Sequence, residues 1–228
     1  MHAICAALSL LAACIAAPAG AQDRGDAAAR VAVPGMVFTR ALNGAAEGSR
    51  VEGQRLVMTS RAKTDNFIEP DGSLANNSAP VLLAEIDNRK PFTLTARVTP
   101  ELIATYDAGA LYLWVRPDWW LKMALERDER GLARMVSVRT QGTSDDNNHD
   151  VVAAKSVHMK ISSDTKTVGF YYSTDAVNWQ LIRLFRNDYP AALWLGVSAQ
   201  SPVGKGQTAA FEDIALSDKS IADFRMGK

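Results

Sequence analysis

The chain has 228 residues, and its 25 basic and 25 acidic side chains give a formal net charge of zero. This balance argues against nucleic acid as a partner, and a hydrophobic content of 47% excludes a wholly disordered chain. The two cysteines, Cys5 and Cys14, both lie near the start. The remainder of the chain therefore has neither a disulfide scaffold nor a cysteine-based zinc site.

Residues 1–21 carry no Lys, Arg, Asp or Glu, and their apolar run over residues 4–17 is too short to span a membrane. The run is followed by a small-x-small pattern at Ala19-Gly20-Ala21. These features predict a signal peptide over residues 1–21 and an exported protein, periplasmic or secreted. An L-A-A-C sequence ending at Cys14 leaves a lipoprotein anchored through that cysteine as the alternative. No later apolar stretch approaches 18 residues, so no membrane span is expected.

After a small, polar segment expected to form a flexible leader (residues 22–30), hydrophobic residues alternate with polar ones, which is typical of β-strands. Turn residues such as Pro117-Asp118 separate the runs, and no long segment shows a helical period. In chain order, the pattern predicts strands at residues 55–59, 81–87, 92–98, 111–116, 120–126, 133–139, 157–162, 167–172, 180–185, 193–199 and 209–216.

So many short strands predict an all-β protein of one domain, residues 31–218, followed by a C-terminal tail at 219–228. The expected architecture is a β-sandwich or jelly roll of two antiparallel sheets. One face of each sheet is expected to pack inward, leaving the other face free for water or a ligand.

The strands at 111–116 and 120–126 should place aromatic and charged side chains together on one outward face. Aromatic rings stack on sugar rings, and charged groups bind sugar hydroxyls, so this face suggests a carbohydrate platform. The alternative is a second packed face, with Lys122 and Glu126 forming a cross-strand pair. Two residues near the end of the next strand, Arg139 and Asp145, could join the same site. The expected ligand-binding residues are therefore Tyr112, Trp114, Trp120, Lys122, Glu126, Arg139 and Asp145.

Several motifs, in order, resemble a family of uncharacterised domains in the concanavalin A-like lectin/glucanase superfamily, often labelled after a regulation-of-enolase protein. The motifs are Thr64-Asp65, Tyr106-Asp107-Ala108-Gly109-Ala110-Leu111, Trp120-Leu121-Lys122-Met123-Ala124-Leu125-Glu126, Ser144-Asp145-Asp146, Tyr172-Ser173-Thr174-Asp175 with Trp179, Ser201-Pro202-Val203-Gly204-Lys205-Gly206 and Phe211-Glu212-Asp213. The resemblance implies a concanavalin A-like jelly-roll sandwich. Similar domains accompany some β-xylosidases, which implies a sugar-related role.

The leading functional hypothesis is an exported, non-catalytic, carbohydrate-binding module. A glycoside hydrolase needs two suitably spaced carboxylates, and Glu126 with Asp145 or Asp65 is the alternative pair. The acidic triplet of laminarinase-type enzymes begins at Glu85-Ile86-Asp87 but has Lys90 in its third position. A third possibility is a protein-interaction or envelope-structural module.

The segment from Thr143 to Asp150 is rich in oxygen ligands, so calcium is a minor alternative there, but a solvated hairpin loop is the preferred interpretation. No other metal and no cofactor is expected. Only His149 and His158 follow the signal segment, and no zinc motif joins them.

Overall fold

The computed structural model describes residues 25–228. The predictions made for the signal peptide, the lipid anchor at Cys14 and the first residues of the leader lie outside these residues. The described part of the chain consists of strands and loops, with no helix long and apolar enough to cross a membrane.

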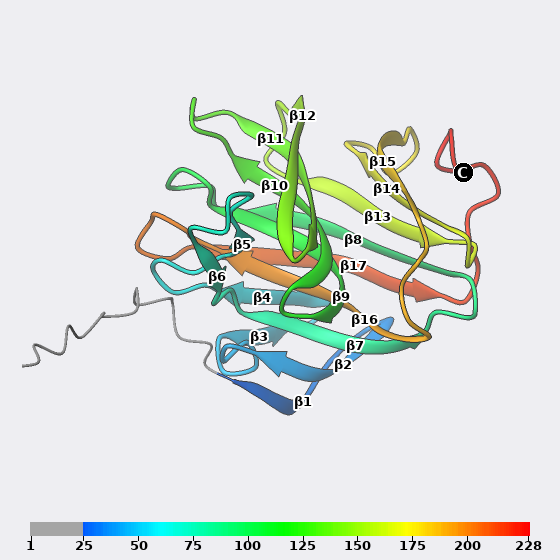
Figure 1. The fold of residues 1–228 in the computed structure, drawn as a ribbon, viewed down its shortest axis with the longest axis horizontal. Helices are drawn as coiled ribbons and strands as arrows, with labels where there is room; N and C mark the ends of the chain where they lie inside the picture. Colours follow the sequence, from blue (N-terminus) through cyan, green and yellow to red (C-terminus); the bar gives the residue numbers. More distant parts are fainter. Residues whose placement is uncertain (1–24) are drawn as a thin grey trace, which may run out of the picture.

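Two antiparallel sheets pack face to face and form the predicted sandwich, with a small hairpin against the larger sheet (Figure 1). The larger sheet has eight strands, in the spatial order β1 (Asp26–Val33), β2 (Met36–Leu42), β7 (Val81–Asp87), β16 (Ala192–Gln200), β9 (Ala108–Arg116), β10 (Trp119–Arg127), β11 (Ala133–Gln141) and β12 (Thr143–Val151). The smaller sheet has seven, in the order β15 (Gln180–Arg186), β14 (Thr167–Ser173), β13 (Val157–Ser163), β8 (Phe92–Pro100), β17 (Thr208–Ser217), β4 (Arg55–Thr59) and β3 (Ser49–Glu52). The hairpin is β5 (Asn66–Ile68) with β6 (Ala75–Asn77).

All eleven strands predicted from the alternation are present, most of them one to three residues longer than expected. Within residues 25–228, six further strands have weaker patterns, and two of these change an expectation. β1 begins at Asp26, so residues 26–28 pair with β2 and residues 29–30 form an irregularity within the strand, instead of belonging to a free leader. The segment expected to be a solvated loop at residues 143–150 is the edge strand β12, which pairs with β11.

The alternation within each strand divides its side chains between two environments. On β9, Leu111 and Leu113 face the smaller sheet and join the core between the two sheets, whereas Tyr112 and Trp114 face outward. Burying apolar side chains releases about 25 cal/mol for each Å² removed from water, so this continuous core favours the sandwich. The core includes Leu94 and Met159 from the smaller sheet.

The outer face of the larger sheet is not free for water or a ligand, which corrects one expectation drawn from the sequence; it is the second packed face that the sequence offered as the alternative. The β5–β6 hairpin lies across it, and Phe67 packs against a second apolar cluster that contains Tyr112, Trp114 and Trp120. The hairpin is tied to the sheet by the amide of Ile68, which donates to Ser144 Oγ at 2.9 Å. The chain thus covers the face with its own residues.

The C-terminal tail is likewise attached, to β13 and β14 of the smaller sheet. The Tyr171 hydroxyl donates to the carbonyl of Phe224 at 2.8 Å, and Lys160 Nζ donates to the carbonyl of Gly227 at the same distance. Lys160 also lies 3.6 Å from the ring centroid of Trp179. Residues 219–228 therefore add packing to the outer side of this sheet.

Candidate functional site

The predicted aromatic residues do lie together on one face, where they form a buried group. The Trp114 and Trp120 rings are stacked, with centroids 6.3 Å apart and planes 3° apart, and Tyr112 is tilted against both. Each ring is at most 2% exposed. They are inaccessible to a sugar ring while the β5–β6 hairpin covers them, so they serve as the floor of the site.

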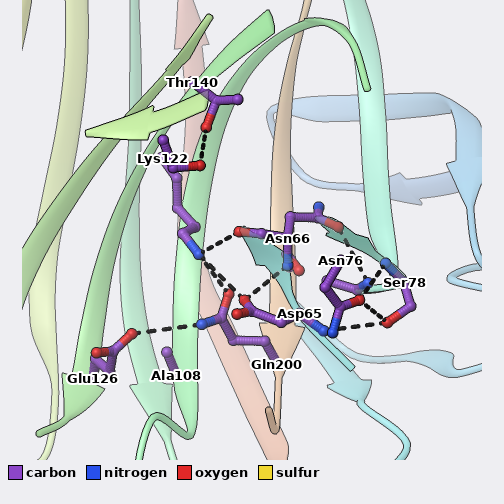
Figure 2. Close-up of polar contacts among 12 residues, drawn as sticks. Asp65, Asn66, Asn76, Ser78, Ala108, Lys122, Glu126, Thr140 and Gln200 are labelled. Atoms are coloured by element: carbon purple, nitrogen blue, oxygen red, sulfur yellow. Dashed lines mark hydrogen bonds and ion pairs between the residues drawn. The ribbon is translucent and has the colours of Figure 1, made fainter. Parts of the chain in front are cut away.

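Lys122 is buried beside these rings and is fully hydrogen-bonded (Figure 2). Its Nζ donates to the carbonyl of Asn66 and to Gln200 Oε1, both at 3.0 Å, and lies 3.4 Å from Asp65 Oδ1. A buried ammonium is tolerable only with such partners. Burial alone would lower the pKa of Lys122, but the Tyr112 oxygen and the Asp65 carboxylate outweigh it, and the pKa is raised.

Asp65 and Asn66 reach Lys122 at the start of the β5–β6 hairpin, which lies over the outer face of the larger sheet. The backbone of Thr64 bridges to Ser201 at the end of β16, which fixes the entry point. Asn66 is completely buried: its Nδ2 donates to the Tyr112 hydroxyl at 3.4 Å, and its Oδ1 accepts from the amide of Ala79 at 3.2 Å. The hairpin thus supplies polar partners to the sheet as well as apolar cover.

Gln200 connects Lys122 to Glu126, which lie four residues apart on the same strand and do not form the cross-strand pair considered from sequence. Gln200 Nε2 donates to Glu126 Oε2 at 3.5 Å, a long hydrogen bond, in the arrangement drawn in Figure 2. Glu126 is 9% exposed, so its carboxyl group lies at the edge of the buried network. Burial is the largest effect and raises the pKa of Glu126 from 4.5 to about 8; the nearby ammonium group of Lys122 opposes this rise, and nearby carboxylates add to it. The carboxyl group is therefore mostly protonated at neutral pH.

The exposed Tyr106 lies near the end of β10, and its side chain interacts electrostatically with Glu129 and Glu126. Its amide donates to the carbonyl of Arg127 at 2.7 Å, and its ring side chain is 39% exposed. The backbone there has φ of +66°, a strained value for a residue with a side chain. The buried Asp107 holds this conformation by accepting from the amide of Ala104 at 2.7 Å and from the Ser201 hydroxyl at 2.6 Å.

Arg139 and Asp145 do not join this site, which corrects the expectation that they extend it. Arg139 pairs in register with Leu121 on one side and with Asp145 on the other. Leu121 faces the core between the sheets, and paired residues point to the same side of a sheet. Arg139 and Asp145 therefore point away from Lys122 and Glu126, toward the smaller sheet.

Sequence reasoning did not identify three members of the site: Asn66, Gln200 and Tyr106. Gln200 had a signal, because it is a polar residue at an outward position at the end of the apolar strand predicted at 193–199. Tyr106 belonged to a quoted motif but was not given a role. Asn66 gave no signal, because its partners come from strands distant in sequence.

The described residues do not bring together a set of side chains that could ligate a metal ion. Among residues 25–228, no group of three or more His, Cys, Asp or Glu side chains is placed to hold a metal ion. In the segment considered for calcium, successive side chains of β12 point to opposite faces of the sheet.

Solved structures share this fold at low sequence identity. A functionally unknown protein from Saccharomyces cerevisiae aligns with a TM-score of 0.71 and 23% identity, over 78% of this chain and 95% of that one. The GH43 protein BlXynB of Bacillus licheniformis aligns with a TM-score of 0.61 and 13% identity, over 80% of this chain and 36% of that one. Lectin I-B4 of Griffonia simplicifolia aligns with a TM-score of 0.50 and 12% identity, over 75% and 90%.

These likenesses establish a lectin-like β-sandwich fold, and this chain spans only about a third of the GH43 protein. The narrower likeness to a regulation-of-enolase protein stays a prediction. No curated protein matches the sequence. Residues 42–219, most of the sandwich, match the family described as "Protein of unknown function (DUF1349)", and the chain belongs to that family.

Proposed function

We propose that this protein is an exported, non-catalytic module that binds a carbohydrate at the edge of the outer sheet face, beside Glu126. The observation that carries the proposal is the state of the Glu126 carboxyl group. It is nearly buried, has one long hydrogen bond, to Gln200 at 3.5 Å, and has a pKa of about 8. The exposed Tyr106, whose amide binds the carbonyl of the following residue Arg127, is close enough for its side chain to interact electrostatically with Glu126.

A protonated carboxyl group both donates and accepts hydrogen bonds, which suits the hydroxyl groups of an uncharged sugar. The ring of Tyr106 offers an apolar surface for the C–H face of the same sugar. The buried network fixes the orientation of Gln200 and so of Glu126, which reduces the ordering cost of binding. The lectin and GH43 names among the structural neighbours support a saccharide as the ligand class.

The carboxylates considered for a glycoside hydrolase are poorly arranged for that reaction. Asp65 is held at Lys122, at 3.4 Å from the ammonium group, and Asp145 points to the opposite side of the sheet from Glu126. Hydrolysis requires an acid and a base or nucleophile on either side of one glycosidic bond. A binding role requires only Glu126 and its neighbours, so we favour binding.

The protein-interaction alternative relied on the aromatic face as a docking surface. That face is covered by the β5–β6 hairpin, and its three rings are almost completely buried. A partner protein would have to displace Phe67 and the polar contacts of Asn66 before reaching them. A small ligand at the Glu126 edge needs no such displacement.

A glycan array with the protein beginning at Gln22 tests the proposal. We expect Glu126→Gln to keep binding, because a carboxamide also donates and accepts, whereas Glu126→Leu loses it. Glu129→Leu, in the exposed loop that follows β10, is the matched control. Absence of binding to any neutral sugar, or equal binding of a neutral sugar by the Glu126→Leu variant, would refute the proposal. If the wild-type protein hydrolysed a sugar on the array and the Glu126→Gln variant did not, the protein would be an enzyme.

Export is tested by the intact mass of the protein recovered from expressing cells. A chain that begins near Gln22 is the expected result. A mass that includes a lipid at Cys14 would place the protein on a membrane surface, and an uncleaved chain would argue against export.

A further inference from the structure

A second group of chemically distinctive residues lies on the other side of the larger sheet, where β11 and β12 meet β15 of the smaller sheet. These strands reach the same upper side of the molecule in Figure 1, and β11 contacts β15 across the sandwich. We name this group the inter-sheet rim, and it comprises Trp119, Arg139, Gln141, Asp145, Arg183 and Tyr189.

Strand register places members of the rim on facing sides of the two sheets. Trp119 pairs with Gln141, two residues along from the Arg139–Leu121 pair, and so points to the same side as Leu121. On β15, Arg183 pairs with the core residue Phe170 and therefore points back toward the larger sheet. The guanidinium groups of Arg139 and Arg183 thus approach the rim from opposite sheets.

Within the part of the chain that the structure describes, neither arginine has an ion pair. Within residues 25–228, the half-buried guanidinium of Arg183 has no hydrogen bond, and it lies over the Phe185 ring at 4.9 Å from the centroid. Arg139 donates only to the amide oxygen of Gln141, at 2.9 Å. Asp145 is the acidic residue next to Arg139 in register, yet no salt bridge joins it to either arginine. Among the described residues, no carboxylate lies within ion-pair distance of either guanidinium group, and Asp145 acts on Arg183 only at longer range. Most other arginines of the described chain have an acidic partner at closer range.

The rim also has an aromatic wall. The Trp119 and Tyr189 rings have centroids 5.6 Å apart, and the Arg116 guanidinium lies 4.8 Å over the Trp119 ring. Both rings are partly exposed. Burial raises the pKa of Tyr189 to about 12, so its hydroxyl remains a neutral hydrogen-bond donor at physiological pH.

We propose that the inter-sheet rim binds an acidic saccharide, with its carboxylate or sulfate group between Arg139 and Arg183 and its ring against Trp119 and Tyr189. Guanidinium groups bind planar carboxylates and sulfate oxygens through charge-assisted, often bidentate hydrogen bonds. The aromatic wall distinguishes a sugar acid from a small inorganic anion. The rim and Glu126 lie on opposite faces of the larger sheet, so this site does not depend on the function proposed above.

Substitution of Asp145 tests the proposal by whether affinity for the acidic saccharide rises or falls. Its carboxylate stands beside Arg139 and would repel an anionic ligand held there. Replacing it by asparagine removes the repulsion and keeps the shape. The Asp145→Asn variant should therefore bind the acidic saccharide more tightly than the wild-type protein, whereas loss of Asp145 would weaken a site that used it as a ligand.

The experiment is isothermal titration calorimetry with three probes: an oligogalacturonate, a sulfated heparin oligosaccharide and a neutral xylo-oligosaccharide. The two acidic probes distinguish a carboxylate site from a sulfate site. We expect at least one of them to bind, and Arg183→Ala or Arg139→Ala to weaken that binding at least about tenfold, the effect of losing one charge-assisted hydrogen bond. Arg186→Ala is the matched control, because Arg186 lies on the same strand but pairs with Asp188 at 2.9 Å.

Arg139 is exposed, so its alanine variant should fold normally, and thermal melting of each variant checks this. The proposal is overturned if neither acidic probe binds, if the neutral probe binds equally at the rim, or if the Arg186→Ala variant loses as much affinity as Arg183→Ala. Since Glu126→Leu leaves the rim intact, it should bind the acidic probe normally. A failure of the proposal for Glu126 is thereby distinguishable from a failure at the rim.

Discussion

Replacement of Glu126 by glutamine should make the protein more stable at high pH, and the size of the effect follows from the carboxyl group's surroundings. In the folded protein, burial raises the pKa of Glu126 from 4.5 to about 8. In the unfolded chain the group is solvated and ionises near its ordinary pKa. The folded state therefore binds one more proton than the unfolded state throughout the range between these two pKa values.

The sign follows from this difference in bound protons. Between pH 4.5 and 8 the native state holds a proton that the unfolded state has released, so the free energy of unfolding falls as pH rises. Each unit of pKa difference corresponds to about 1.4 kcal/mol. Integrated from pH 5 to pH 9, Glu126 lowers the stability of the wild-type protein by up to about 4 kcal/mol.

Glutamine has the shape of the protonated acid and carries no charge at any pH. The Glu126→Gln variant should match the wild type near pH 5, where the carboxyl group is already neutral in the folded state, and exceed it at pH 9. Urea unfolding of both proteins at pH 5, 7 and 9 measures the difference directly. Other titrating groups, such as Lys160, affect both proteins alike and cancel.

A stability difference that is the same at all three pH values would contradict this prediction, because it would mean that Glu126 has an ordinary pKa in the folded state. A variant that is less stable than the wild type at pH 9 would show that the ionised carboxylate is stabilised in the site. In that case Gln200 and Lys122 would act as its partners, and the proposed neutral acid would be wrong.

Three further substitutions test the packing of the site, each by urea unfolding at pH 7. Lys122→Met should destabilise the protein by about 3–5 kcal/mol because its buried oxygen partners lose their cation, whereas Lys166→Met on the surface should change stability little. Trp120→Ala should cost about 3–5 kcal/mol by leaving a cavity beneath the β5–β6 hairpin. Gly196→Ala should lower the free energy of unfolding by at least about 1–3 kcal/mol, because a Cβ there would lie closer than any allowed contact to the backbone of Leu82. Unchanged stability in any of these three variants would show that the structure around that residue relaxes freely.

The strands of the sandwich could be predicted because each carries a local signal. Leu111 and Leu113 alternate with Tyr112 and Trp114, and this period of two identifies both the strand and its two faces. The edge strand β12 could not be identified in this way, because its nine residues contain almost no apolar side chain. Its pairing with β11 gives it structure without an apolar pattern.

What covers the outer face could not be predicted, because it depends on contacts between segments far apart in the chain. The partners of Lys122 are contributed by Asp65, Asn66 and Gln200, up to 78 residues away in sequence. The side to which Arg139 points depends on which residue of β10 lies opposite it. Because side chains alternate, a register one residue different would have placed Arg139 beside Lys122.

The two faces of the larger sheet differ in how their charges are compensated, and this difference predicts how each responds to salt. The charge of Lys122 is balanced by Asp65 within the buried network, and Glu126 is protonated at neutral pH, so a sugar bound there meets no net charge. At the inter-sheet rim, Arg139 and Arg183 lack ion-pair partners within the described chain.

Salt screens interactions between charges over about 8–10 Å at physiological ionic strength. Raising the salt concentration from 50 to 500 mM should therefore leave binding of a neutral sugar at Glu126 nearly unchanged and weaken binding of an acidic saccharide at the rim. Equal salt dependence for the two ligands, measured by calorimetry on the wild-type protein, would mean that both bind at one site.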